Sequence, residues 1–278
     1  MKKKWLSIPY ALWALIFSIA PLVIIAVYSF CSRSPYGKII YKFTFEHYRK
    51  FMEPIYLNVL WRSLLLAMIS TVVCLLVGYP MAMIISKASL KKRNILMMLF
   101  VLPLWTNFLL RTYAWMVLLR DQGPINQLLL SLGIIDEPLK LLYNTGAVTL
   151  GMVYNFIPFM VLPVYSVLAK MDECLIEAAK DLGATSTQVF LKITLPLSMP
   201  GVVSGIIMVF MPAVSTFVIS DLLGGGQTIL LGNLIQNQFL VARNWQFGSA
   251  ISMIMMVLIV IAMTISSKYK SEDGGGLW

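Results

Sequence analysis

DECLIEAAKDLGATSTQVFLKITLP, residues 172 to 196, is the longest strongly polar interval between two long apolar segments of this chain. Its pattern predicts two short helices joined at Gly183, because glycine suits the left-handed conformation that ends many helices. Asp172 is placed to cap the first helix. Thr185 and Gln188, three residues apart, form a capping box for the second. We therefore expect a pair of helices that lies outside a lipid bilayer.

The first of these two helices is amphipathic. Leu175, Ala179 and Leu182 recur at the spacing of one helix face, beside acidic and basic side chains. Such a stripe is typical of an ordinary connector between membrane segments, and it also suits a helix that docks on a partner. Glu177 and Asp181 stay available to polar partners in either case.

The composition of the chain excludes an ordinary soluble domain. Of its 278 residues, 59% are apolar and 12% are charged, whereas soluble proteins carry about a quarter charged residues. The net charge of +10 does not indicate nucleic-acid binding, because the basic residues are scattered at segment ends, where they anchor membrane helices. We therefore predict an all-α, polytopic membrane protein.

Uncharged runs that are long enough to span a bilayer predict six transmembrane helices, since a crossing takes about 20 helical residues. The third run alone carries a charged residue, Arg111. The first run is too long for the apolar part of a cleavable signal, so we expect a retained helix. The runs lie near residues 8 to 30, 63 to 86, 95 to 118, 145 to 168, 197 to 220 and 248 to 267.

Basic residues near the ends of these runs indicate which side of the membrane is cytoplasmic. They are only slightly more numerous on the side of the N-terminus, which carries Lys2 to Lys4. The short connection KASLKKRN, residues 87 to 94, is the clearest indicator, because charge in a tight loop governs orientation most strongly. It predicts that both termini and residues 170 to 196 are cytoplasmic.

Three connections between the runs carry further structural signals. In the first, Thr44 can cap a short helix that ends before Pro54. Another amphipathic piece lies between Pro124 and Pro138. Residues 222 to 242 are uncharged but rich in Asn and Gln, which favours an interfacial or re-entrant segment over a seventh span, because amides in a bilayer need partners.

The polar interval resembles the EAA loop of ABC importer permeases. The family pattern is EAA, three residues, G, nine residues, I, one residue and LP, and every defining position matches: Glu177, Ala178, Ala179, Gly183, Ile193, Leu195 and Pro196. In that family the loop inserts a short helix into a groove of the ATPase subunit. The resemblance implies a type I importer permease fold, with residues 1 to 278 as a single transmembrane domain and residues 170 to 196 as its cytoplasmic coupling loop.

Other stretches resemble the permease subunits of spermidine/putrescine ABC importers. They are GYPMA at 78 to 82, LPLWTNFLLRTYAW at 102 to 115, IPFMVLPVYS at 157 to 166, EAAKDLGA at 177 to 184, and SDLLGGG with LLGN around 220 to 233. The resemblance implies a subunit of the bacterial inner membrane that pairs with a second, homologous permease. It also implies two ATPase subunits, which bind ATP and Mg²⁺, and an extracytoplasmic polyamine-binding protein.

The chain lacks the signatures of an enzyme. It contains no G-x-x-x-x-G-K-[ST] phosphate loop, and the glycines at 224 to 226 are not followed by the lysine and hydroxyl that hold phosphates. Cys31, Cys74 and Cys174 are too widely spaced for a metal site, and His47 is the only histidine. We therefore expect a transport subunit without cofactor, catalytic residues or metal.

A polyamine path should offer aromatic faces for cation–π contact and a few well-placed carboxylates. The aromatic candidates are Trp105, Tyr113, Trp115 and Tyr154. Trp105 is the strongest, because Pro103 beside it could loosen the helix and expose the ring. All of these residues also fit a role in packing or in the aromatic belt of a membrane helix.

Asp221 and Arg111 are the charged residues that matter most for this hypothesis. Asp221, at the outer end of the fifth run, could meet an arriving cation, or it could cap a helix or pair with Arg111. An unpaired arginine in a span costs several kcal/mol, so Arg111 should face a partner or water, as a gate or as a scaffold. Two alternatives stay open: the same architecture importing another solute, and a six-span secondary carrier without an ATPase.

Overall fold

The computed structural model describes residues 13, 15–33 and 39–271. They form two units: residues up to 61 with 231–260, and residues 62–230 with those from 261 onward. Apart from one two-stranded sheet, the secondary structure of the described residues is helical, so the predicted all-α class is confirmed.

The core of the 62–230 unit is the contact between α8 (Thr145–Leu168) and α11 (Leu195–Ser215). Gly201 and Gly205 are buried where the two helices cross. A Cβ at Gly205 would lie 2.6 Å from Met160 Sδ, and one at Gly201 would lie 2.9 Å from the carbonyl oxygen of Pro163. These two glycines therefore allow the close helix contact that small residues permit in membrane proteins.

The longest helix, α4 (Pro54–Ser86), joins this core through side chains of its second half. The hydroxyl oxygens of Tyr79 and Ser198 lie 2.8 Å apart, which ties α4 to α11. Ser70 Oγ donates to Met152 Sδ on α8 at 3.4 Å. Three apolar helices thus share one packed interior, and these two polar contacts lie inside it.

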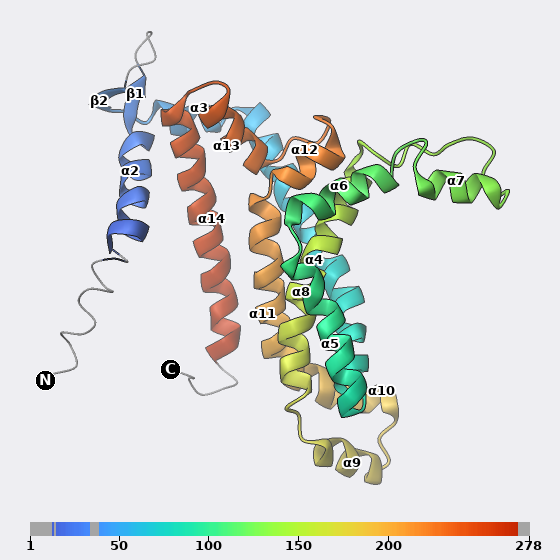
Figure 1. The fold of residues 1–278 in the computed structure, drawn as a ribbon. Coiled ribbons are helices and arrows are strands. Elements are labelled where there is room, and N and C mark those ends of the chain that lie inside the picture. The colour runs from blue at the N-terminus through green and yellow to red at the C-terminus, as the bar shows by residue number, and fades with distance from the viewer. Residues whose placement is uncertain (1–12, 14, 34–38, 272–278) are drawn as a thin grey trace, which may run out of the picture. The chain divides into compact units, whose positions relative to one another are not determined.

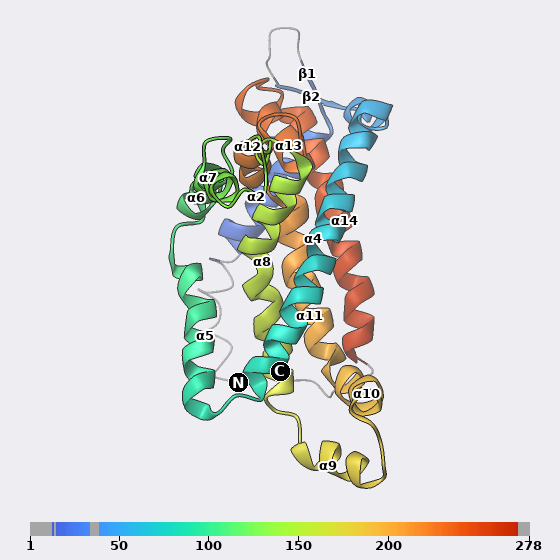
Figure 2. The same cartoon turned by 90° about the vertical axis from the view of Figure 1, so that its right-hand side faces the viewer.

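Figures 1 and 2 show what lies at the two ends of this helix packing. At one end are the short helices α9 (Glu173–Asp181) and α10 (Ser186–Val189). At the other are α6 (Phe108–Leu118), α7 (Pro124–Ser131) and α12 (Val218–Gly224). The polar loop predicted between the fourth and fifth spans therefore lies well away from the second set of connections.

Four or five of the six predicted spans can be recognised among the described residues. Four helices are long and apolar enough to cross a bilayer: α4, α8, the continuous helix of residues 186–215, and α14 (Trp245–Ser271). A fifth crossing requires α5 (Leu90–Trp105) and α6 to count as one span. The first predicted span corresponds to η1 (Leu15–Ile19) and α2 (Ala20–Ser29), and its residues 8–12 and 14 lie outside the described residues.

The first connection differs from the prediction in two ways. The second span starts at Pro54, because proline is favoured in the first turn of a helix and no other proline follows until Pro80. A hairpin of β1 (Cys31–Arg33) and β2 (Ile39–Phe43) was not predicted, although the β-branched Ile39 and Ile40 favour a strand. The expected short helix is present as α3 (Glu46–Phe51), and Thr44 Oγ1 accepts from the Glu46 amide at 3.2 Å.

The other unit is held together by a small apolar cluster. Phe51, Leu231, Phe247 and Ile251 are almost fully buried against one another. Leu231 begins α13 (Leu231–Leu240), whose 10 residues are too few to cross a bilayer, as predicted for this stretch.

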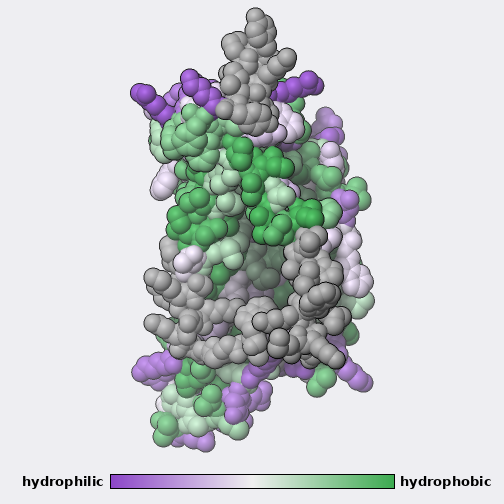
Figure 3. Space-filling model, turned by 90° about the vertical axis from the view of Figure 1, so that its left-hand side faces the viewer, coloured by the Kyte–Doolittle hydropathy of each residue, from purple (hydrophilic) through white to green (hydrophobic). Residues whose placement is uncertain are grey.

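Many large apolar side chains are exposed on the helices. In α2, Leu22 and Ile24 are about half exposed, and so are Val257 and Val260 in α14. Figure 3 shows hydrophobic side chains gathered on the face that it draws. Exposed apolar surface of this kind is expected where helices meet lipid tails.

Candidate functional site

The first helix of the polar loop, α9, has the two ends that its sequence predicts. At its start, Asp172 Oδ1 accepts from the Cys174 amide at 3.0 Å. At its end, Gly183 takes a φ of +83°. The Gly183 amide donates to the Lys180 carbonyl at 2.8 Å and the Ala184 amide donates to the Ala179 carbonyl at 3.0 Å, which is the Schellman pattern.

The second helix, α10, is fixed by the predicted capping box. The Thr185 amide donates to Gln188 Oε1 at 2.9 Å, and the Gln188 amide donates to Thr185 Oγ1 at 3.4 Å. One π-helical turn, η2 (Phe190–Thr194), then leads into α11. Ile193 lies in that turn, and α11 begins at Leu195.

The two halves of the loop differ in how they are anchored. Val189 is buried, and the ring of Phe190 meets the ring of Tyr79 edge to face at a centroid distance of 5.8 Å. By contrast, α9 has no buried residue, and Leu182 is 89% exposed. The helix that carries Glu177, Ala178 and Ala179 therefore presents a free surface, although its sequence would allow it to pack.

A cavity of about 350 Å³ separates α9 from the ends of the membrane helices. Glu173, Glu177 and Lys180 line it from α9. Lys87, just after α4, and Arg93, near the start of α5, line it from the other side. Glu177 is thus exposed at the surface and also shares a cavity with cations of its own chain. The sequence analysis did not predict this cavity.

Cys174 marks the exposed start of α9. The hydrogen bond with the Asp172 side chain, together with the negative charge of that carboxylate, raises the pKa of the Cys174 thiol. The thiol is therefore less nucleophilic at neutral pH than its exposure alone would suggest, because the thiolate is the reactive form.

The third predicted span is broken. α5 and α6 are bent by 95° at residues 106 and 107, where a single helix was expected. Thr106 Oγ1 donates to the Pro103 carbonyl at 2.7 Å, and Asn107 Oδ1 accepts from the Leu109 amide at 2.8 Å, capping α6. Trp105, the last residue of α5, is consequently 87% exposed. The polar pair Thr106-Asn107 within an apolar run was the signal for this break.

The candidate transport residues do not form one cluster. Tyr154 on α8 packs edge to face on Trp115 of α6, with ring centroids 5.3 Å apart. Tyr113, also on α6, is 45% exposed. Asp221 lies exposed on α12, which packs against α8. The structure therefore brings one aromatic pair together and leaves Trp105 and Asp221 on separate elements.

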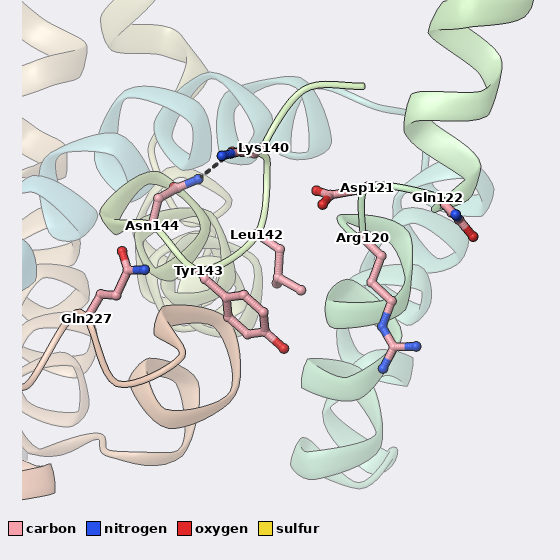
Figure 4. Close-up of a pocket in the computed structure, with 8 residues that line it drawn as sticks. All are labelled: Arg120, Asp121, Gln122, Lys140, Leu142, Tyr143, Asn144 and Gln227. Atoms are coloured by element: carbon pink, nitrogen blue, oxygen red, sulfur yellow. Dashed lines mark hydrogen bonds between the residues drawn. The ribbon is translucent and has the colours of Figure 1, made fainter. Parts of the chain in front are cut away.

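A polar pocket at the same end as α6 and α12 was not predicted. It has a volume of about 680 Å³ and is drawn in Figure 4. Its lining residues are Arg120, Asp121, Gln122, Lys140, Leu142, Tyr143, Asn144 and Gln227. Asn144 Nδ2 donates to the Lys140 carbonyl at 3.0 Å, and Asn144 Oδ1 caps α8. The Asn-Thr pair at the start of the fourth run was the available signal for this cap.

Arg111 lies on α6 beside another cavity, of about 530 Å³. Its Nε and Nη1 atoms are buried and have no hydrogen-bond partner, so neither is paired with Asp221. Asn155 on α8 lines the same cavity, and its Oδ1 atom is also buried without a partner. Neither nitrogen therefore has a hydrogen-bond partner among the described residues, and the prediction that Arg111 faces a partner or water stays a prediction.

Comparison with known proteins places the chain in a family. Residues 74–269 match the family of the binding-protein-dependent transport system inner membrane component. The chain is similar to the spermidine/putrescine transport system permease protein PotB of Haemophilus influenzae, with 41% identity over 91% of this chain and 88% of that protein. PotB of Escherichia coli strain K12 is 40% identical over 91% and 92%.

A solved bacterial ABC transporter, involved in the import of the acidic polysaccharide alginate, has the same fold. Its matching chain superposes with a TM-score of 0.78 over 96% of both chains, at 17% identity. The family match covers more than half of the sequence, and the relatives exceed 30% identity over nearly all of it. This chain belongs to the family of inner-membrane components of binding-protein-dependent transport systems.

Proposed function

We propose that this chain is the permease subunit of an ATP-driven ABC importer for spermidine and putrescine, and that it forms half of the translocation pathway. The observation that carries the proposal is the exposed helix α9, with both of its ends fixed, in a chain that is 41% identical to a spermidine/putrescine permease. The other half of the pathway belongs to a second, homologous permease.

Coupling to ATP hydrolysis takes place through α9 in this proposal. A helix that offers unburied apolar residues and acidic side chains such as Glu177 and Asp181 can fit a groove in an ATPase subunit. The caps at Asp172 and Gly183 hold the helix in shape before it docks, which lowers the entropy cost of binding. ATP and Mg²⁺ are bound by two such ATPase subunits and not by this chain.

The polyamine cargo is supported by the similarity to PotB and by the chemistry of the exposed aromatic residues. Trp105 is exposed at the break between α5 and α6, and an aromatic face can attract an ammonium group with about 0.5 to 2 kcal/mol. Asp221 supplies a carboxylate that raises the local concentration of a polycation. Tyr113 and Tyr154 complete the candidate path.

The proposed orientation puts α9, α10 and both termini in the cytoplasm. It is supported by the basic connection at residues 87 to 94, which lies beside α9 in the folded chain. The opposite end, with α6, α7 and α12, then faces an extracytoplasmic polyamine-binding protein. A solved transporter of the same fold carries its own periplasmic protein, bound to alginate pentasaccharide.

Uptake by sealed vesicles that hold the assembled complex tests this function. Vesicles with ATP inside and the loaded binding protein outside should accumulate labelled spermidine and putrescine. They should not accumulate an unrelated neutral solute such as maltose. Accumulation that continues without ATP would contradict the coupling, and accumulation of the unrelated solute alone would contradict the cargo.

A further inference from the structure

The cavity beside Arg111 is lined from four helices of the 62–230 unit. Its lining residues are Leu104, Phe108, Arg111, Asn155, Phe156, Phe159, Met208 and Pro212. Arg111 leaves Nε and Nη1 buried and unpaired, and Asn155, which is 1% exposed, leaves Oδ1 unpaired. The other end of the Asn155 amide is satisfied, because Nδ2 donates to the Gly151 carbonyl at 2.9 Å. Unpaired donors and an unpaired acceptor therefore line one cavity.

A counter-charge would lower the cost of burying an arginine in this position. The guanidinium group stays protonated in proteins, so it cannot escape the cost of burial by losing its proton. None of the described residues that line the cavity is acidic. Water would hydrate Arg111 without neutralising it, and a polyamine, being a cation, would be repelled. A counter-charge for Arg111 therefore has to be an anion from outside the cavity lining.

The surroundings of the cavity indicate that this anion belongs to another protein chain. α5, which ends at the cavity, is an apolar helix without a single buried residue. Leu110 beside Arg111 is 68% exposed, and Met208 in the lining is 52% exposed. Lipid tails alone would explain this exposed apolar surface, but they would not explain a buried cation within it, because intramembrane charges face a partner or water rather than lipid.

We propose that Arg111 is the docking cation for a carboxylate on a membrane helix of the second permease subunit. In the assembled pair, a glutamate or aspartate of that subunit enters the cavity and accepts hydrogen bonds from Arg111 Nε and Nη1. Arg111 is then a positioning residue at the permease interface and not a ligand for the substrate. This inference rests on the proposed function, because it requires a second permease.

The test is retention of the second permease by tagged Arg111 variants, co-expressed and purified in mild detergent. Arg111→Met keeps length and apolar bulk but removes the charge, and we expect it to retain at least about tenfold less partner, as expected for a lost charge pair. Arg111→Glu should lose more, and Arg111→Lys should retain most of the partner. Arg120→Met, which removes an exposed arginine that shares its pocket with Asp121, is the matched control and should behave like wild type.

A charge swap identifies the carboxylate. Acidic residues in the membrane helices of the second permease are changed to arginine one at a time, and one of these changes should restore retention by Arg111→Glu. If Arg111→Glu fails to reach the membrane, Arg111→Met decides the question. Retention at the wild-type level by Arg111→Met would overturn the inference, as would capture of a second copy of this chain in place of the partner. If the wild-type chain captures no permease, the proposed function fails as well.

Discussion

The two ends of the 62–230 unit are built in different ways. At the α9 end, the shape is set by hydrogen bonds between residues at most five positions apart, such as the Ala184 amide and the Ala179 carbonyl. At the opposite end, local bonds are joined by bonds between residues that are distant in sequence. The Tyr143 amide donates to the Leu223 carbonyl at 3.0 Å, and Asn126 Nδ2 donates to the Leu139 carbonyl at 2.9 Å. The conformation of the α9 end is therefore set by residues close in sequence, whereas that of the opposite end also depends on contacts between distant segments.

This difference predicts that equivalent substitutions have different costs at the two ends. Each end uses glycines with positive φ, where any other residue is strained by about 1 to 2 kcal/mol. Around Gly183 there is no atom within 4 Å of an added Cβ. At Gly225 an added Cβ would instead press into the ring of Tyr143. Strain alone acts at the first position, and strain with overpacking acts at the second.

The largest effect on stability is therefore expected for Gly225→Ala. Overpacking costs about 1 to 3 kcal/mol, so the sum with backbone strain is about 2 to 5 kcal/mol in the free energy of unfolding. Gly226→Ala is the matched control, because Gly226 has a φ of +80° and no atom within 4 Å of an added Cβ. Denaturant unfolding in detergent measures both variants, and equal losses would show that Tyr143 plays no part.

At the α9 end, Gly183→Val should harm coupling more than folding. Strain of about 1 to 2 kcal/mol in the docking conformation corresponds to a fall in uptake of about tenfold, with normal insertion and ATP hydrolysis no longer linked to transport. Gly133→Val is the control at the other end, since Gly133 has a φ of +67° and is equally unobstructed. An equal loss in both variants would contradict a special role for α9.

Glu177→Lys tests the same coupling through charge. Glu177 lies among Lys87, Arg93 and Lys180, so reversing its charge repels α9 from the chain as well as from a partner. Uptake should fall while the protein stays in the membrane. Glu177→Gln, which keeps the shape of the side chain, should retain more uptake, and wild-type uptake by Glu177→Lys would remove the basis for the claim.

A smaller effect is expected in the candidate transport path. Trp105→Leu removes about 0.5 to 2 kcal/mol of cation–π attraction but keeps apolar bulk. Asp221→Asn removes a charge at similar shape, and its effect should be larger for spermidine than for putrescine, because spermidine carries an extra ammonium group. Uptake is compared at matched abundance and matched ATPase stimulation. Normal transport of both polyamines by both variants would make these residues structural.

The smallest expected effect concerns the reactivity of Cys174. Asp172→Asn keeps a side chain that caps α9 but removes the negative charge that helps to raise the pKa of the thiol. The pKa should fall, so maleimide labelling at neutral pH should become faster. The two rates should converge as the pH rises above both pKa values. Glu173→Gln should accelerate labelling less, and identical rates for Asp172→Asn and wild type would contradict the assignment.

The sequence was most informative where local rules decide the structure. The caps at Asp172, Gly183 and Thr185 were all predicted, because each depends on neighbours in the chain. The break after Trp105 was missed, because hydropathy averages over the polar pair that follows it. Residues far apart in the chain, such as Arg111 and Asn155, can line one cavity without leaving any periodic pattern in the sequence.

Family membership narrows the two alternatives that the sequence left open. The match to the family of binding-protein-dependent transport components and to PotB permease proteins favours the ABC importer over a secondary carrier without an ATPase. The fold does not identify the solute, since a transporter involved in alginate import shares this fold at only 17% identity. In our proposal the loop at residues 170 to 196 couples the chain to the ATPase, and the cargo depends on residues elsewhere.

The central claim is that the α9 end meets the ATPase and the α7 end does not. A photoreactive phenylalanine derivative is placed at Leu182, which is 89% exposed, or at Leu132, which is 63% exposed just after α7. Illumination of the assembled complex should link position 182 to the ATPase subunit, and position 132 should give no such product. Absence of the ATPase product at position 182, or its appearance at position 132, would contradict the claim.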